Sequence, residues 1–216
     1  MPEQKRTEKE VNEKRQSLEK LVADIQAQTK ELANLQRWKR LLYDDGVGLE
    51  EIAKESFELL GAQVANKTPE KDDYRLSVPG RGPCVLEVKG SRKDQFLRRD
   101  LRQLSEWIDQ VTSDELVTVK GAFLGNGSRE KEPSSRGSMF ESNNIDYAKL
   151  KQMVLMRSVD LYCLVLLALL KMLNADEFWD RFFACSGEFD ASEYWDALPP
   201  EFRLGPTEKP PVANSA

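Results

Sequence analysis

The sequence predicts an α/β fold in which a short mixed β-sheet is flanked by helices and preceded by a coiled-coil helix. A seven-residue apolar repeat runs from Val11 to Leu42, and short strand-like runs alternate with amphipathic helical patterns after it. Apolar residues make up 40% of the 216 residues, which is enough for a packed core. We expect a coiled-coil helix over 1–42, a globular domain over 43–200 and a disordered tail over 201–216.

The charge composition limits the chemistry that the chain can perform. It has 37 acidic and 32 basic residues, a net charge of −5, and no histidine. The absence of histidine excludes His-based catalytic triads, His general bases and His-ligated metals. Metal chemistry would therefore depend on carboxylates, which select hard cations such as Mg²⁺ or Mn²⁺.

The cysteines and the apolar runs indicate a protein of the reducing cytosol. Cys84, Cys163 and Cys185 are odd in number, widely spaced and in apolar surroundings, which argues against a disulfide framework or a zinc site. The N-terminus is charged throughout, unlike a signal peptide. The longest apolar run, 161–170, is too short to span a bilayer. We therefore expect a cytoplasmic protein with no membrane partner.

The N-terminal repeat has the a/d spacing of a coiled coil. The a series is Val11, Leu18, Ile25 and Leu32, and the d series is Lys14, Leu21, Gln28, Leu35 and Leu42. Lys14 weakens the first turns, whereas a buried Gln28 would help to fix the register. The pattern predicts a homo-oligomer that associates through residues 11–42. The alternative is a single amphipathic helix that lies on the globular domain.

Turn signals divide the rest of the chain into elements. Asp44-Asp45-Gly46 ends the first helix, and Pro79-Gly80-Arg81-Gly82 is a strong turn signal. We expect helices over 49–60, 94–111 and 160–173 and around Asp146, strands over 62–66, 73–78, 84–88 and 116–124, and a flexible loop over 125–138. The strands over 73–78 and 84–88 form a predicted β-hairpin.

This hairpin brings charged side chains together. Alternate residues of a strand share a face, so Glu87 and Lys89 point the same way. A tight turn centred on Gly80-Arg81 sets Asp73 opposite Val88, beside both charged residues. Such a group can hold Mg²⁺ or Mn²⁺ through Asp73 and Glu87, with Lys89 positioning or deprotonating a water molecule at a phosphodiester.

The choice of aspartate stays open from geometry alone. With a simple register, Asp72 and not Asp73 shares the face of Glu87 and Lys89. A bulge or a longer turn shifts the register by one residue and reverses the choice.

These residues resemble the signature of the PD-(D/E)XK nuclease superfamily. Asp73, followed by Glu87-Val88-Lys89, matches its order and spacing, although Asp72 stands where the family often has proline. The resemblance covers roughly residues 43–170. It implies a restriction-endonuclease-like core that hydrolyses phosphodiester bonds with Mg²⁺ or Mn²⁺.

Further residues resemble one branch of that superfamily. Glu50, with Glu51 as its neighbour, matches a helical acid that completes the metal site, and Gln103 matches an active-site glutamine on the helix after the Lys strand. Gly90 completes a Glu-Val-Lys-Gly pattern. The resemblance implies a catalytic set of Glu50, Asp73, Glu87, Lys89 and Gln103, with Asp73, Glu87 and Glu50 as metal ligands.

A basic cluster follows the Lys strand directly. Its members are Arg92, Lys93, Arg98, Arg99 and Arg102. Such a patch would guide phosphates to the metal despite the acidic total, although a solvated helix face also has this composition.

Together these features predict a Mg²⁺-dependent endonuclease, with DNA favoured over RNA and a role in restriction, repair or antiphage defence by family analogy. The alternatives are a catalytically inactive nuclease-fold scaffold and a coiled-coil interaction protein that binds a protein partner.

Overall fold

The computed structural model describes residues 2–65 and 74–204. The chain forms two compact units, one ending at Lys39 and the other beginning at Arg40. None of the helices in these residues is long and apolar enough to cross a membrane.

The first unit is the long helix α1 (Pro2–Arg37). Its heptad residues are exposed: Val11, Leu18, Leu21, Ile25, Leu32 and Leu35 keep between 38% and 60% of their accessible surface. The predicted single helix over 1–42 is too long, because a turn follows Arg37 and a separate helix α2 (Arg40–Tyr43) begins the second unit. Leu42, assigned to the d series, is buried there beside Leu41, where α2 packs against α6 (Ser158–Leu169).

The second unit contains a mixed sheet, as the sequence predicts. Among the described residues its strands lie in chain order: β1 (Gln63–Ala65), β2 (Tyr74–Ser77), β3 (Cys84–Gly90), β4 (Lys120–Asn126), β5 (Met153–Arg157) and β6 (Gly187–Glu188). The first three strands pair antiparallel, and β3 to β6 pair in parallel.

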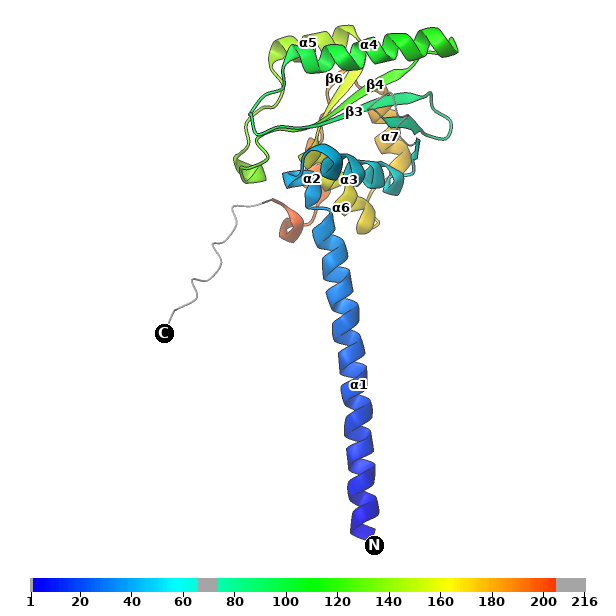
Figure 1. The fold of residues 1–216 in the computed structure, drawn as a ribbon, viewed down its shortest axis with the longest axis vertical. Helices are drawn as coiled ribbons and strands as arrows, with labels where there is room; N and C mark the ends of the chain where they lie inside the picture. Colours follow the sequence, from blue (N-terminus) through cyan, green and yellow to red (C-terminus); the bar gives the residue numbers. More distant parts are fainter. Residues whose placement is uncertain (1, 66–73, 205–216) are drawn as a thin grey trace. The chain divides into compact units, whose positions relative to one another are not determined.

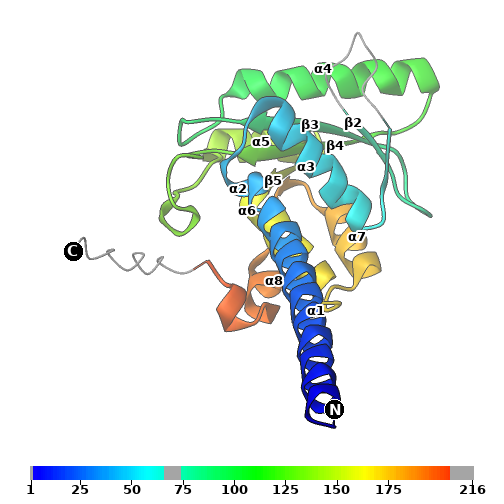
Figure 2. The same cartoon turned by 60° about the horizontal axis from the view of Figure 1, so that its bottom comes forward.

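Helices cover both faces of this sheet (Figure 1). One face carries α4 (Arg98–Glu115) and α5 (Ser142–Leu150), and the other carries α2, α3 (Gly46–Leu59) and α6. The layer under α4 and α5 is apolar and holds Val85, Leu101, Leu104, Phe123 and Leu155 among others. The shorter helices α7 (Ala175–Ala184) and α8 (Ser192–Ala197) follow α6, and α8 lies beside α6 (Figure 2).

Several predicted boundaries shift because tertiary packing overrides local pattern. Helix α4 begins at Arg98 rather than Asp94, since Phe96 is drawn into contact with Phe123 and Phe140 before the helix starts. The strand predicted from Leu116 begins at Lys120, because α4 continues to Glu115 and Leu116 follows in the left-handed conformation.

The predicted flexible loop over 125–138 is largely anchored. Strand β4 continues to Asn126, and Gly127 and Ser128 are buried after it. Arg136 donates to the carbonyl oxygen of Lys131 at 3.0 Å and to Asn126 Oδ1 at 2.9 Å. Strand β5 was not predicted, because a strand buried on both faces is a continuous apolar run without alternation.

Candidate active site

Strand β3 carries the two charged residues of the predicted site on one face of the sheet. Glu87 pairs in register with Phe123, and Val85 belongs to the apolar layer under α4. By strand alternation Val85, Glu87 and Lys89 all face α4, whereas Leu86 and Val88 face α3. The predicted common face of Glu87 and Lys89 is therefore present.

Lys89 forms an ion pair that the sequence did not predict. Its Nζ lies 2.6 Å from Oδ1 of Asp100, in the first turn of α4. The Asp100 side chain is 10% exposed and the Lys89 side chain 38% exposed. The second oxygen of Asp100, Oδ2, accepts a hydrogen bond from the backbone N–H of Leu97 at 2.9 Å. One carboxylate therefore both caps α4 and orients the lysine.

Glu87 is a buried carboxylate with an apolar flank. It is 8% exposed, and its register partner Phe123 on β4 is fully buried. The register partner of Lys89 is Gly125, where a Cβ atom would lie 2.5 Å from the ring of Phe96. The glycine thus lets an aromatic ring lie against the strand beside the lysine. A carboxylate in such a place is costly unless cations or hydrogen bonds compensate it.

The observed hairpin corrects the assumed register by one residue. Arg81 N–H donates to the carbonyl oxygen of Val78, so the turn is centred on Pro79-Gly80 and not on Gly80-Arg81. Gly80 has a φ of +75°, as the third residue of a type II turn requires. The last described pair of the hairpin is Tyr74 with Leu86.

Asp73 and Asp72, the two candidate aspartates, lie outside the described residues. Among the residues that the structure describes, no group of three or more acidic or cysteine side chains is placed to hold a metal ion. The predicted three-carboxylate site of Asp73, Glu87 and Glu50 is therefore not assembled by the described part of the chain.

Glu50 lies on the helix that covers the other face of β3. It is half-buried on α3, next to the fully buried Leu49. The amino end of α3 meets the carboxyl end of β3, because a Cβ atom on Gly90 would lie 2.5 Å from Cβ of Asp45. The glycine of the Glu-Val-Lys-Gly pattern thus permits close approach of two backbones.

Gln103 is exposed on α4, one turn after Asp100. The residue of α4 that contacts the β3 lysine is the aspartate and not the glutamine. A signal for Asp100 existed in the sequence, since acidic residues are favoured in the first turn of a helix. That preference does not predict that Asp100 contacts Lys89, which lies on a strand and stands eleven positions earlier in the sequence.

The predicted basic cluster is exposed but not uniform. Arg92 Nε pairs with Glu130 at 2.8 Å. The guanidinium of Arg98 lies 4.1 Å from the ring centroid of Tyr147 and donates to the carbonyl oxygen of Asn143, so it fastens α4 to α5. Lys93, Arg99 and Arg102 are also exposed, and Arg99 directly precedes Asp100.

Two solved structures of the restriction endonuclease FokI are similar to this fold. One structure of FokI matches with a TM-score of 0.52 over 69% of this chain, and a structure of FokI bound to DNA matches with 0.50 over 71%. The fold is restriction-endonuclease-like. Sequence identity to both is 12%, and the match spans 30% of each FokI chain, so the likeness concerns the fold alone. No family model and no curated protein matches the sequence.

Proposed function

We propose that the chain is a divalent-cation-dependent nuclease of the PD-(D/E)XK type that cuts DNA in preference to RNA. The observation that carries this proposal is the placement of Glu87 and Lys89 on one face of β3, within a restriction-endonuclease-like sheet. One of the two similar structures is of FokI bound to DNA, which favours a DNA substrate here.

We assign Asp73 as the carboxylate that joins Glu87. The hairpin pairs Tyr74 with Leu86, and one further antiparallel step would pair Asp73 with Glu87. The same step would leave Asp72 on the other face. Glu50 is the third proposed ligand: although α3 covers the other face of β3, its amino end meets the carboxyl end of that strand.

Carboxylate oxygens fit a hard divalent cation such as Mg²⁺ or Mn²⁺. When bound, this cation supplies Lewis-acid activation of water and neutralises charge on the phosphodiester. Lys89, held by Asp100, would donate to a phosphate oxygen from the same face of the sheet. Lys93, Arg99 and Arg102 would hold the flanking backbone phosphates, with Gln103 on the same exposed stretch of α4.

Nuclease activity of a Glu87→Ala variant tests the proposal directly. Supercoiled plasmid, linear duplex and RNA would be incubated with Mg²⁺, Mn²⁺ or EDTA. We expect DNA cleavage that EDTA abolishes, and a loss of about 100-fold or more in Glu87→Ala, since a metal ligand is removed. Glu87→Gln, which keeps the size of the side chain, should be equally inactive.

The matched control is Glu106→Gln, which removes an exposed carboxylate from α4. It should cleave like the unchanged chain. Circular dichroism would establish that each variant is folded. Unchanged cleavage by folded Glu87→Ala would show that Glu87 is not part of the active site. Cleavage in EDTA would show that the reaction needs no divalent cation.

A catalytically inactive nuclease-fold scaffold is the second candidate. The ion pair between Lys89 and Asp100 favours it, because a lysine already paired with a carboxylate can serve structure alone. In that case the chain would bind DNA without cutting it, in Mg²⁺, in Mn²⁺ and in EDTA alike.

A further inference from the structure

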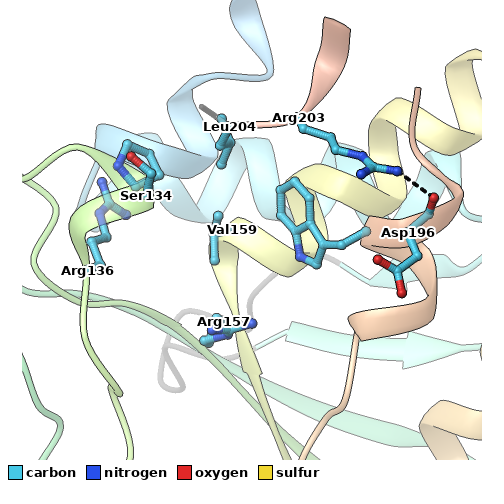
Figure 3. Close-up of a pocket in the computed structure, with 9 residues that line it drawn as sticks. Ser134, Arg136, Arg157, Val159, Asp196, Arg203 and Leu204 are labelled. Carbon is cyan, nitrogen blue, oxygen red and sulfur yellow. Dashed lines mark hydrogen bonds between the residues drawn. The ribbon is translucent and has the colours of Figure 1, made fainter. Parts of the chain in front are cut away.

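A second site lies at the carboxyl end of β5, where Arg157 is two strands away from Lys89 in the register of the sheet. A cavity of about 390 Å³ opens there, and its lining residues are Pro133, Ser134, Arg136, Arg157, Val159, Trp195, Asp196, Arg203 and Leu204. Figure 3 shows Arg136 and Arg203 on either side of Val159, with Arg157 below it. We call this cavity the arginine pocket.

One wall of the arginine pocket is fixed by a buried carboxylate. Asp160, fully buried in the first turn of α6, binds Arg157 through both oxygens, at 2.6 Å to Nε and 2.7 Å to Nη2. Its Oδ1 also accepts a hydrogen bond from Trp195 Nε1 at 3.0 Å. The guanidinium and the indole are therefore held in position before any ligand arrives, which lowers the entropic cost of binding.

The guanidinium groups of Arg136 and Arg203 are positively charged, and hydrogen bonds to backbone carbonyls orient them. Arg203 donates to the backbone carbonyls of Leu198 at 2.9 Å and Asp196 at 2.7 Å. Among the described residues, the hydrogen-bond acceptors of Arg136 are likewise backbone carbonyls and the amide oxygen of Asn126. Burial lowers the pKa of Arg136, and an anion in the cavity would compensate this loss of hydration.

The residues that line the pocket include three arginines and one carboxylate, that of Asp196. Carboxylates outside the lining also act on these arginines: Asp160, Glu188 and Asp190 on Arg157, and Glu132 on Arg136. The positive excess therefore belongs to the lining itself, next to an aromatic ring. A cavity of this size suits a ligand as large as a mononucleotide. In α/β proteins, ligands usually bind at the edge of the sheet where the carboxyl ends of the parallel strands lie.

We propose that the arginine pocket binds a nucleoside 5′-phosphate, with the phosphate on Arg136, Arg157 and Arg203 and the base against Trp195. The phosphate ester could belong to a free nucleotide or to the 5′ end of a DNA strand. Both sources present the same chemistry, a terminal phosphate attached to a nucleoside.

Isothermal titration calorimetry of the full chain in EDTA tests this proposal, because cleavage is then absent. Deoxyadenosine 5′-monophosphate should bind with a dissociation constant of about 1 mM or tighter, whereas deoxyadenosine should not bind detectably. Inorganic phosphate should bind at least about tenfold more weakly than the nucleotide, since it lacks the base. Equal binding of phosphate and nucleotide would overturn the role of Trp195.

Arg203→Gln is the variant of choice, since Arg203 is exposed and its partners are backbone carbonyls. Losing one charged donor should weaken nucleotide binding about tenfold. Trp195→Ala should weaken binding of the nucleotide and leave that of inorganic phosphate unchanged. Lys54→Gln, which removes a half-buried lysine of α3 that pairs with Glu58, and Glu87→Ala should both bind the nucleotide like the unchanged chain, so this result does not depend on nuclease activity.

Oligonucleotides with a 5′-phosphate or a 5′-hydroxyl separate the two sources. Preference for the phosphorylated strand assigns the pocket to DNA ends, whereas binding of the free nucleotide alone assigns it to the nucleotide pool. The proposal is overturned if neither ligand binds, or if Arg203→Gln binds them unchanged.

Discussion

At the scale of single residues, Asp100 is the group that links the helix to the candidate active site. Its two oxygens serve different partners, the backbone of Leu97 and the ammonium of Lys89. An ion pair with a partly exposed lysine contributes little to stability, about 1 kcal/mol or less, so the effect of this one should be on orientation.

Asp100→Asn should lower cleavage at least about tenfold while the chain stays folded. An asparagine can still accept from Leu97, but it then presents an amide donor to the lysine. The measurement is the cleavage rate, made also in a Lys89→Ala background, where Asp100→Asn should have no further effect. Full activity of the single Asp100→Asn variant would contradict the role of this ion pair.

The identity of the second carboxylate is also decided at this scale. Asp73→Asn should abolish cleavage, and Asp72→Asn should retain it within about threefold, because a one-residue step reverses the face of a strand. Cleavage rates of the two purified variants under Mg²⁺ provide the test. If Asp72→Asn is the inactive one, the pairing of Tyr74 with Leu86 does not continue toward the N-terminus.

At the scale of elements, the notable feature is the exposed apolar series of α1. An exposed apolar stripe of this kind indicates an interaction surface. In a parallel pair, each of Lys14 and Gln28 would meet its own counterpart, and the a layers at Leu18, Ile25 and Leu32 would remain wholly apolar. We therefore propose a parallel coiled-coil dimer.

Leu18→Asp combined with Leu21→Asp should convert the dimer into a monomer. Each buried charge would cost about 3 kcal/mol or more, which is comparable with the stability of a short coiled coil. Light scattering at micromolar concentration measures the mass. Ala23→Asp, on the opposite side of α1, is the control and should remain dimeric. If the unchanged chain is itself a monomer at this concentration, the coiled-coil proposal is wrong.

At the scale of the whole molecule, the helix proposed to associate and the folded sheet belong to different units. The sheet and its covering helices lie within the unit that begins at Arg40. A nuclease centre cuts one strand, so two centres brought together by a dimer would permit double-strand cleavage.

Deletion of residues 1–36 should leave a folded, monomeric nuclease. It keeps Trp38, which is 3% exposed. The melting temperature should change by less than about 4 °C, which corresponds to roughly 1 kcal/mol for a domain of this size. On supercoiled plasmid the deletion should produce nicked circles, whereas the full chain should produce linear DNA. Linear product from a monomeric deletion would show that dimerisation is not required.

Local periodicity was enough to determine several features of this protein from the sequence alone. The common face of Glu87 and Lys89 follows from two-residue alternation, and the long helix follows from its seven-residue repeat. Trp179 and Phe182 lie three residues apart on α7, and both are buried. In each case the signal lies within a few neighbouring residues, where backbone geometry fixes which side chains share a face.

Only the tertiary structure decided the features that join distant segments. The seven residues between the paired Leu76 and Cys84 set the hairpin register one residue from the assumed one, and the apolar run at 153–156 forms a strand because it pairs with β4. The contact of Lys89 with Asp100 and the gathering of three arginines around one cavity depend on how helices cross the sheet. These placements are set by the packing of the whole core, which no local window of the sequence contains.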